Sequence, residues 1–268
     1  SGNGILAQVF DSTGAASGNV INVNTTTSST QAEPAVAGLS DGRFVVTWES
    51  NSQDGSGYGI FGQIYDARGA AQGSEFQINT ASNGSQRYAN ASALESGRFI
   101  VVWESEDGSG DGIFGQIFDA SGAKEGSELS INTVTGGTQL RPDVSLLSDG
   151  GFVAVWQDSN VANDDGWGIQ GQRFNSSGVA VGDQFSVNTY TASSQENPEV
   201  VGLENGGFVV VWQSYSQATS DRWTLHSQVF DANGAPVGSE FRIDSGTESN
   251  AEQFSVSATD EDGFVVVW

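Results

Sequence analysis

A short run of an aromatic residue, three aliphatic or small residues and a tryptophan returns five times along this chain, at residues 44–48, 99–103, 152–156, 208–212 and 264–268. The tryptophans are 55, 53, 56 and 56 residues apart. Five glutamines keep the same spacing: Gln8, Gln63, Gln116, Gln172 and Gln228. Two markers with one period indicate a tandem repeat, and a period near ~50 residues with strand-like content is typical of β-propellers.

Each repeat unit contains four predicted strands. In the unit at residues 34–80, a short apolar run precedes the β-forming residues 44–48, and two further strand-like runs follow at residues 60–65 and 75–78. Glycine-containing turns separate these runs, and no stretch shows the 3.6-residue period of a helix. The sequence therefore predicts an all-β fold: a five-bladed β-propeller of four-stranded antiparallel blades.

The ends of the chain predict how this propeller closes. The chain begins with a third strand at residues 5–10 and ends with a second strand at residues 264–268. We expect two N-terminal strands to join two C-terminal strands in one blade, because an unpaired blade would expose an open sheet edge. The prediction is a single domain, residues 1–268, with blades at residues 34–80, 89–133, 142–189, 198–244, and 254–268 plus 4–25. The recurrent tryptophans and phenylalanines are expected to pack between blades.

The charge of the chain restricts its partners. It has 33 acidic and 9 basic residues, for a net charge of −24. Nucleic acid is excluded as an expected partner because phosphate binding needs a basic patch. No apolar run is long enough to span a membrane, so membrane insertion is not expected. A glycan or a cell-surface protein remains the expected partner. The start at Ser1 without a methionine indicates part of a larger or processed chain.

Two sets of residues are candidates for ligand binding, because variable loops on a rigid scaffold usually carry binding sites. Aromatic residues precede the third strand at Tyr58, Trp167 and Trp223. They would either stack on a sugar or pack on a neighbouring loop. Glutamines stand 13 residues before the second-strand phenylalanine at Gln31, Gln86, Gln139 and Gln195. Their amides would either bind a hydroxylated ligand or tie one blade to the next.

Several loops have the Asp/Gly composition of calcium-binding loops. The candidate metal ligands are Asp54, Asp107, Asp111, Asp164 and Asp165. Calcium takes ~6–8 oxygen ligands from carboxylates, amides and carbonyls in a bent loop. Calcium is therefore the candidate cofactor, and ordinary Asp-Gly turns are the alternative interpretation.

Catalytic signals are weak in the sequence. His226 is the single histidine, and phenylalanines occupy its position in other repeats, so it is predicted to be a surface or interblade substitution. An acid pair for glycoside hydrolysis would place unlike carboxylates on the first strands, near the axis. These strands are instead typified by Ala35, Val36, Ala91, Val144 and Val200. The sequence therefore predicts that the chain is not an enzyme.

The motifs Phe-Val-Val-x-Trp-[Glu/Gln]-Ser and Asp-Gly-Ser-Gly-x-Gly-Ile-Phe-Gly-Gln resemble repeats of large, secreted, acidic bacterial proteins of the RTX and adhesin kind. The five-blade count is similar to tachylectin-like lectins in architecture. The resemblance implies an extracellular location at the bacterial cell surface. The leading prediction is a non-catalytic binding module for glycans or cell-surface adhesion. The alternatives are a structural spacer or assembly domain, and a glycosidase-like propeller.

Overall fold

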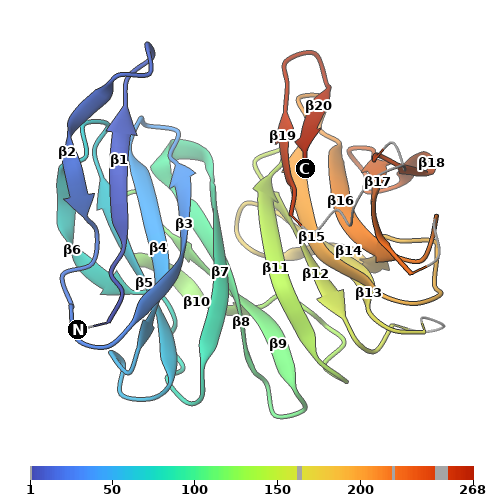
Figure 1. Ribbon diagram of the computed structural model, residues 1–268, viewed down its shortest axis with the longest axis horizontal. Coiled ribbons are helices and arrows are strands. Elements are labelled where there is room, and N and C mark those ends of the chain that lie inside the picture. The colour runs from blue at the N-terminus through green and yellow to red at the C-terminus, as the bar shows by residue number, and fades with distance from the viewer. Residues whose placement is uncertain (1, 162–164, 219–220, 245–252) are drawn as a thin grey trace. The chain divides into compact units, whose positions relative to one another are not determined.

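The computed structural model describes residues 2–161, 165–218, 221–244 and 253–268. Within these ranges the chain consists of strands and loops, and a 3₁₀ turn at Glu95–Gly97 is the one helical element (Figure 1). The all-β fold class predicted from the sequence is therefore confirmed.

Four blades are complete four-stranded antiparallel sheets, with strands in the order of the sequence. The first consists of β3 (Gln31–Gly38), β4 (Phe44–Asn51), β5 (Tyr58–Tyr65) and β6 (Ala71–Gln77). The second consists of β7 (Gln86–Ala93), β8 (Phe99–Glu106), β9 (Asp111–Phe118) and β10 (Lys124–Ser130). The third consists of β11 (Gln139–Leu146), β12 (Phe152–Asp158), β13 (Gly168–Phe174) and β14 (Ala180–Ser186). The fourth consists of β15 (Gln195–Gly202), β16 (Phe208–Tyr215), β17 (Trp223–Phe230) and β18 (Pro236–Arg242).

The remaining strands form two two-stranded sheets, which we call half blades. One contains β1 (Leu6–Phe10) and β2 (Ala16–Asn22), and the other contains β19 (Ser255–Ala258) and β20 (Phe264–Val267). Four complete blades and two half blades are the strand content of the five-bladed propeller predicted from the sequence.

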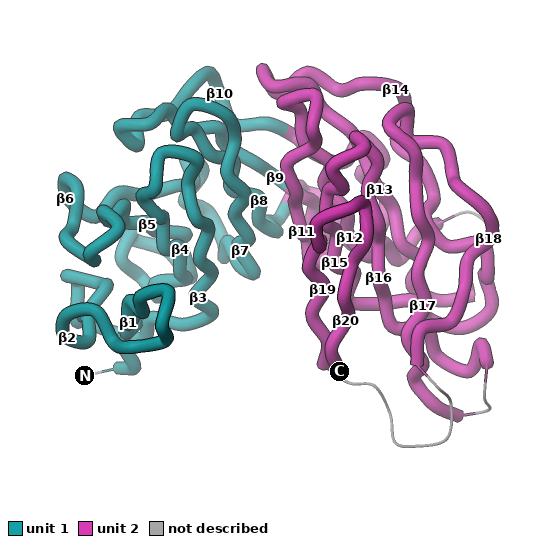
Figure 2. The backbone as a smooth tube through the Cα atoms, turned by 90° about the horizontal axis from the view of Figure 1, so that it is seen from above, with its two compact units in different colours: residues 1–106, 114–129 teal, residues 107–113, 130–268 magenta. Residues whose placement is uncertain are grey.

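The chain divides into two compact units, which we describe separately (Figure 2). Unit 1 holds residues 1–106 and 114–129, and unit 2 holds residues 107–113 and 130–268. The half blade β1–β2 belongs to unit 1, and the half blade β19–β20 belongs to unit 2. The pairing of residues 5–10 with residues 264–268, and with it the single-domain organisation, therefore stays a prediction.

The repeated phenylalanines and tryptophans form the core between consecutive sheets, as predicted. In unit 2, Val153 and Val155 of β12 share one cluster with Phe208, Val210 and Trp212 of β16. These side chains are fully buried. Successive residues of a strand point to opposite faces, so alternate residues of one second strand join different clusters. The near-continuous apolar run of the second strand follows from burial on both faces.

The same alternation continues to the last half blade. Val209 and Val211, on the other face of β16, pack with Phe264 and Val266 of β20. The opposite face of β20 is exposed, and Val267 has 60% of its surface accessible.

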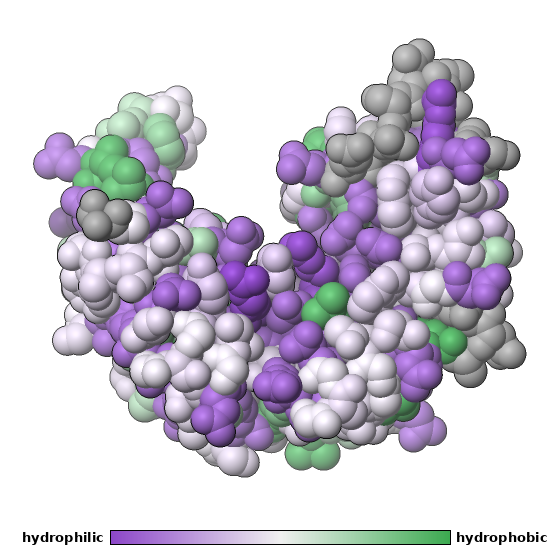
Figure 3. Space-filling view, turned by 60° about the horizontal axis from the view of Figure 1, so that its bottom comes forward, coloured by the Kyte–Doolittle hydropathy of each residue, from purple (hydrophilic) through white to green (hydrophobic). Residues whose placement is uncertain are grey.

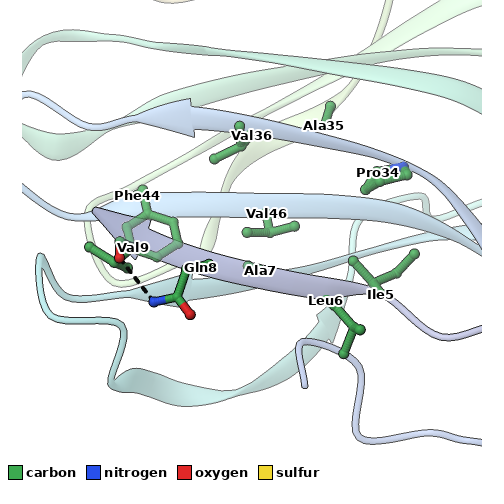
Figure 4. Close-up of a pocket in the computed structure, with 10 residues that line it drawn as sticks. All are labelled: Ile5, Leu6, Ala7, Gln8, Val9, Pro34, Ala35, Val36, Phe44 and Val46. Atoms are coloured by element: carbon green, nitrogen blue, oxygen red, sulfur yellow. Dashed lines mark hydrogen bonds between the residues drawn. The ribbon is translucent and has the colours of Figure 1, made fainter. Parts of the chain in front are cut away.

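Unit 1 contains an apolar pocket of about 440 Å³ between β1 and the first two strands of blade one (Figure 4). Its lining residues are Ile5, Leu6, Ala7, Gln8, Val9, Pro34, Ala35, Val36, Phe44 and Val46. Phe44 and Val46 are the blade-one counterparts of Phe99 and Val101, which pack against the preceding blade in unit 1. The pocket therefore lies at the face of blade one that the repeat predicts to meet β20.

The face drawn in Figure 3 carries mostly hydrophilic residues and residues of intermediate hydropathy, with some hydrophobic residues among them. This agrees with the net charge of −24. In the described part of the chain, no helix has the length and apolarity needed to cross a membrane.

Candidate active site

The first strands of consecutive blades pack against one another. Within unit 1, β3 packs against β7, and within unit 2, β11 packs against β15 and β15 against β19. The fourth strands carry mostly exposed residues. The first strands therefore form the inner edge of their sheets, as predicted, and residues on neighbouring first strands come together.

Each of the four complete first strands begins at a glutamine, three residues earlier than the predicted blade boundaries. The glutamines Gln31, Gln86, Gln139 and Gln195 are buried. In each, the side-chain carbonyl accepts a hydrogen bond from an asparagine at the end of the preceding repeat, and the amide nitrogen donates to a carbonyl of the blade-to-blade connection. These contacts match the interpretation that the glutamines tie one blade to the next.

A β-bulge follows each glutamine. The register between the first and second strands shifts at the same place in all four complete blades, where one extra residue is inserted into the first strand. The residue after the bulge takes the fifth position of the strand. This position holds Ala35, Asn90, Asp143, Glu199 and, in the last half blade, Ser255.

Asp143 and Glu199 therefore place unlike carboxylates on two adjacent first strands, β11 and β15. Both side chains are half-buried. Asp143 Oδ2 accepts a hydrogen bond from the Val200 backbone N–H at 2.7 Å. Glu199 Oε2 accepts one from the Val256 N–H at 2.9 Å, and the Ser255 hydroxyl is a second donor to Glu199. Each carboxylate thus reaches from its own strand to the next one.

These surroundings raise the pKa of both carboxyl groups. Burial, reinforced by the nearby Glu199 charge, raises the pKa of Asp143 to about 7, against the opposing effect of the backbone N–H donors. Burial also raises the pKa of Glu199, and its two hydrogen-bond donors oppose this. A carboxyl group that holds a proton near neutral pH is suited to general acid catalysis.

Glu196 and Arg141 lie beside this pair. Glu196, on β15, is half-buried, and burial raises its pKa while the charge of Arg141 opposes the shift. Arg141 is exposed and precedes Asp143 by two positions on β11. Unit 2 therefore gathers Asp143, Glu196, Glu199 and Arg141 on two neighbouring strands.

Two of the predicted aromatic residues at the loop tips, Tyr58 and Trp223, have ring contacts with neighbouring side chains. Tyr58 is half-buried, and the guanidinium of Arg87 lies 4.3 Å from its ring centroid. Trp223 contacts Tyr215, with ring centroids 5.2 Å apart. Trp167 is half-buried, and its backbone carbonyl accepts a hydrogen bond from the Gln195 N–H at 2.7 Å. None of the contacts described for these three residues involves Asp143 or Glu199.

The predicted calcium ligands sit in loop turns. Asp54 Oδ1 accepts from the Ser56 N–H, and Asp107 Oδ1 accepts from the N–H and hydroxyl of Ser109. Asp111 begins β9, Asp165 is exposed, and Asp164 lies outside the described residues. No group of three or more acidic, histidine or cysteine side chains suited to a metal occurs in the described ranges. Calcium binding therefore stays a prediction.

His226 is buried in β17 and not at the surface. Its Nε2 lies 3.1 Å from Thr224 Oγ1, and its Nδ1 lies 3.7 Å from a carboxylate oxygen of Glu240. Burial lowers the pKa of His226 despite the nearby acidic groups. These two polar partners belong to β17 and β18, and neither is Asp143 or Glu199.

Comparison with known proteins identifies solved structures with a similar fold. No protein-family model and no curated protein matches the sequence. An α-L-arabinanase of Penicillium chrysogenum in complex with arabinobiose has a TM-score of 0.59 and 17% identity, covering 88% of this chain and 74% of that one. A GH93 α-L-arabinofuranosidase of Fusarium graminearum with arabinobiose has a TM-score of 0.58 and 13% identity, with the same coverages of 88% and 74%. An endo-arabinase from Bacteroides thetaiotaomicron has a TM-score of 0.52 and 15% identity, covering 87% of each chain. At these identities the likeness shows the five-bladed propeller fold.

Two conclusions of the sequence analysis are corrected by these findings. The prediction of a non-catalytic module, with no enzymatic activity, is contradicted, because the three similar structures named above are glycoside hydrolases. The prediction that the first strands lack an acid pair is also wrong, because Asp143 and Glu199 stand on them. The fold comparison gives no link to RTX proteins, adhesins or tachylectin-like lectins.

The raised pKa of Asp143 predicts a change in stability with pH. An aspartate has a pKa of about 3.9 in an unfolded chain. Because the folded-state value is higher, at about 7, the folded state binds the proton more tightly. Its contribution to stability is complete below the unfolded pKa and is lost as the pH rises through the folded pKa. Asp143→Asn, which carries no charge at any pH, should therefore gain stability over the wild type at pH 8 relative to pH 4.

Urea denaturation of both proteins at pH 4, 6 and 8 measures this difference. Glu204→Gln, at an exposed turn position of unit 2, is the matched control and should show a smaller change. A difference between Asp143→Asn and the wild type that stays constant from pH 4 to pH 8 would contradict the raised pKa.

Proposed function

We propose that this chain is a glycoside hydrolase whose acid pair is Asp143 and Glu199. The observation that carries the proposal is their placement: two unlike carboxylates occupy the fifth position of adjacent first strands, where the other blades have Ala35, Asn90 and Ser255. Glycosidases commonly use one carboxylic acid and one carboxylate on either side of the scissile bond. The similarity to solved glycoside hydrolases supports the proposal at the level of the fold.

The surroundings of the two groups give them different roles. Asp143 holds its proton near neutral pH, so it is the proton donor to the glycosidic oxygen. Glu199 accepts hydrogen bonds from the Val256 N–H and the Ser255 hydroxyl, and both donors favour its ionised form. Glu199 therefore supplies the carboxylate, either as base toward water or as nucleophile toward the anomeric carbon. Bond cleavage transfers the Asp143 proton to the leaving sugar hydroxyl.

Charge and fold together point to a neutral polysaccharide as substrate. A net charge of −24 disfavours the approach of polyanionic chains. Three similar structures are an arabinanase, an endo-arabinase and an arabinofuranosidase, and two of these hold arabinobiose. Arabinan is therefore the first substrate to test. We also propose an extracellular location, because polysaccharides such as arabinan are encountered outside the cell.

The test is release of reducing sugar from arabinan, xylan and mannan as neutral polymers and from polygalacturonate as a polyanion. The wild type is expected to release sugar from a neutral polymer and not from polygalacturonate. The double variant Asp143→Asn with Glu199→Gln, which keeps the size and hydrogen-bonding shape of both side chains, is expected to be inactive. No release from any of the polymers, or equal release by the double variant, would overturn the proposal.

A further inference from the structure

The β-bulge of the first strands holds a non-glycine residue in a left-handed backbone conformation in every complete blade. These residues occupy the third position of the strand and have φ of 47° at Glu33, 50° at Tyr88, 55° at Arg141 and 52° at Asn197. Left-handed conformations are unfavourable for residues with a Cβ atom, and glycine would adopt them without this cost. None of the four positions carries glycine.

The preceding blade fixes this conformation. In unit 1, the Tyr88 N–H donates to Glu49 Oε1 at 2.7 Å, and in unit 2, the Asn197 N–H donates to Gln157 Oε1 at 2.9 Å. Glu49 and Gln157 each follow the tryptophan of their second strand. In these two pairs of blades, the residue after the tryptophan therefore holds the bulge of the next blade. Strained residues persist where surrounding structure over-determines them, and they cluster at functional sites.

The residue at this position differs in every blade while its frame repeats. Each strand begins with glutamine, and three of the four have proline directly after the left-handed residue, at Pro34, Pro142 and Pro198. A bulge next to a site re-aims the side chain that it carries. A constant frame with a variable, non-glycine residue indicates that the side chain itself is used.

In unit 2, two of these residues flank the acid pair. Arg141 is exposed and lies two positions before Asp143 on β11, and Asn197 lies two positions before Glu199 on β15. The Asn197 amide nitrogen donates to Gln213 Oε1 at 2.7 Å. Gln213 lies on the neighbouring strand β16, so this hydrogen bond fixes the orientation of the Asn197 amide. Guanidinium and amide groups both hydrogen-bond sugar hydroxyls.

We propose that Arg141 and Asn197 are specificity-determining residues that contact the sugar chain held at Asp143 and Glu199. The inference rests on the proposed function. Arg141 donates to hydroxyl and ring oxygens of a neutral sugar, and Asn197 holds the neighbouring unit through its side-chain carbonyl. The hydrogen bonds of Asn197 to Gln157 and Gln213 position its side chain before the substrate arrives.

Substitution by glycine distinguishes the role of each side chain in sugar binding from its role in the stability of the fold. Arg141→Gly removes the side chain and relieves the left-handed strain, so its thermal midpoint should stay equal or rise. Asn197→Gly relieves the same strain but also loses the hydrogen bond to Gln213, so its KM is compared together with its thermal midpoint. Ser96→Gly is the matched control, because Ser96 is also left-handed, with φ of 61°, but lies in a turn at the other end of its sheet. Loss of one or two hydrogen bonds predicts a KM for arabinan about tenfold higher in each site variant, with kcat changed much less.

The wild-type assay on arabinan comes first, so failure of the proposed function is seen before any glycine variant is measured. If the wild type is active, binding of linear arabino-oligosaccharide is measured by calorimetry on Asp143→Asn with and without Arg141→Gly. Weaker binding with an unchanged thermal midpoint supports the inference. Unchanged KM and binding, or a lowered thermal midpoint, would overturn it while leaving the acid pair in place. An inactive wild type would overturn both proposals.

Discussion

Asp143→Asn is expected to lower the rate of sugar release by about 100-fold to 10,000-fold, the range for loss of a general acid. The asparagine carbonyl can still accept the hydrogen bond from the Val200 N–H, which Asp143 accepts at 2.7 Å. The repeat itself supplies a precedent, because Asn90 occupies the equivalent position in blade two. The substitution therefore removes the proton while keeping the link between strands.

The measurement is kcat/KM on arabinan for the wild type and the variant between pH 4 and 9. Activity of the wild type should fall as the pH rises through about 7, because Asp143 then loses the proton it donates. Near-ultraviolet circular dichroism reports whether the tryptophan core is intact, and Glu204→Gln controls for the loss of one negative charge. A variant that keeps more than about a tenth of the wild-type rate would rule out Asp143 as the proton donor.

The fold was predictable because the core repeats with the sequence. Trp48, Trp103, Trp156 and Trp212 are all fully buried, and each belongs to a second strand with β-branched neighbours. Packing between sheets needs the same side chains in every blade, so the core residues recur in the sequence at a regular spacing. The 55-residue spacing therefore indicated strand order and core residues together.

The candidate site was not predictable in the same way, because it consists of departures from the repeat. Asp143 and Glu199 differ from each other and from Ala35 at the same position, so no motif includes them. Alignment of the first strands on their initial glutamine would have shown two acids at one position. The predicted blade boundaries begin instead at the following apolar run, whose typical residues Val144 and Val200 are the direct neighbours of the two acids.

The backbone conformation of the bulge explains why the sequence does not reveal this alignment. A left-handed residue is usually marked by glycine, yet Arg141 and Asn197 adopt this conformation without it. The conformation of Asn197 depends on an acceptor from the preceding blade, Gln157, which lies 40 residues away in the sequence. Local sequence patterns carry no signal for such a contact. The initial glutamines were visible, but their role as links between blades needed the hydrogen-bond partners.

Closure of the fifth blade predicts that a Val9→Cys, Val265→Cys variant forms an intramolecular disulfide. In blade four, Val209 of β16 pairs with Val229 of β17, and residues 265 and 9 are their counterparts in the repeat. Directly opposed residues of antiparallel strands are within disulfide range. Val9 lines the apolar pocket of unit 1, and Val265 is 48% exposed in unit 2, so closure would also cover both apolar surfaces.

The disulfide would join residues near the two ends of the sequence, so it should stabilise the folded chain by about 3–5 kcal/mol. Free-thiol titration and non-reducing electrophoresis at low protein concentration detect the bond, because the chain has no cysteine of its own. Urea denaturation with and without reductant measures the stabilisation. Val9→Cys with Val266→Cys is the control, since a one-residue shift turns the second thiol to the opposite face. Two free thiols in oxidised Val9→Cys, Val265→Cys protein, or cross-links only between chains, would show that the two half blades do not pair within one molecule.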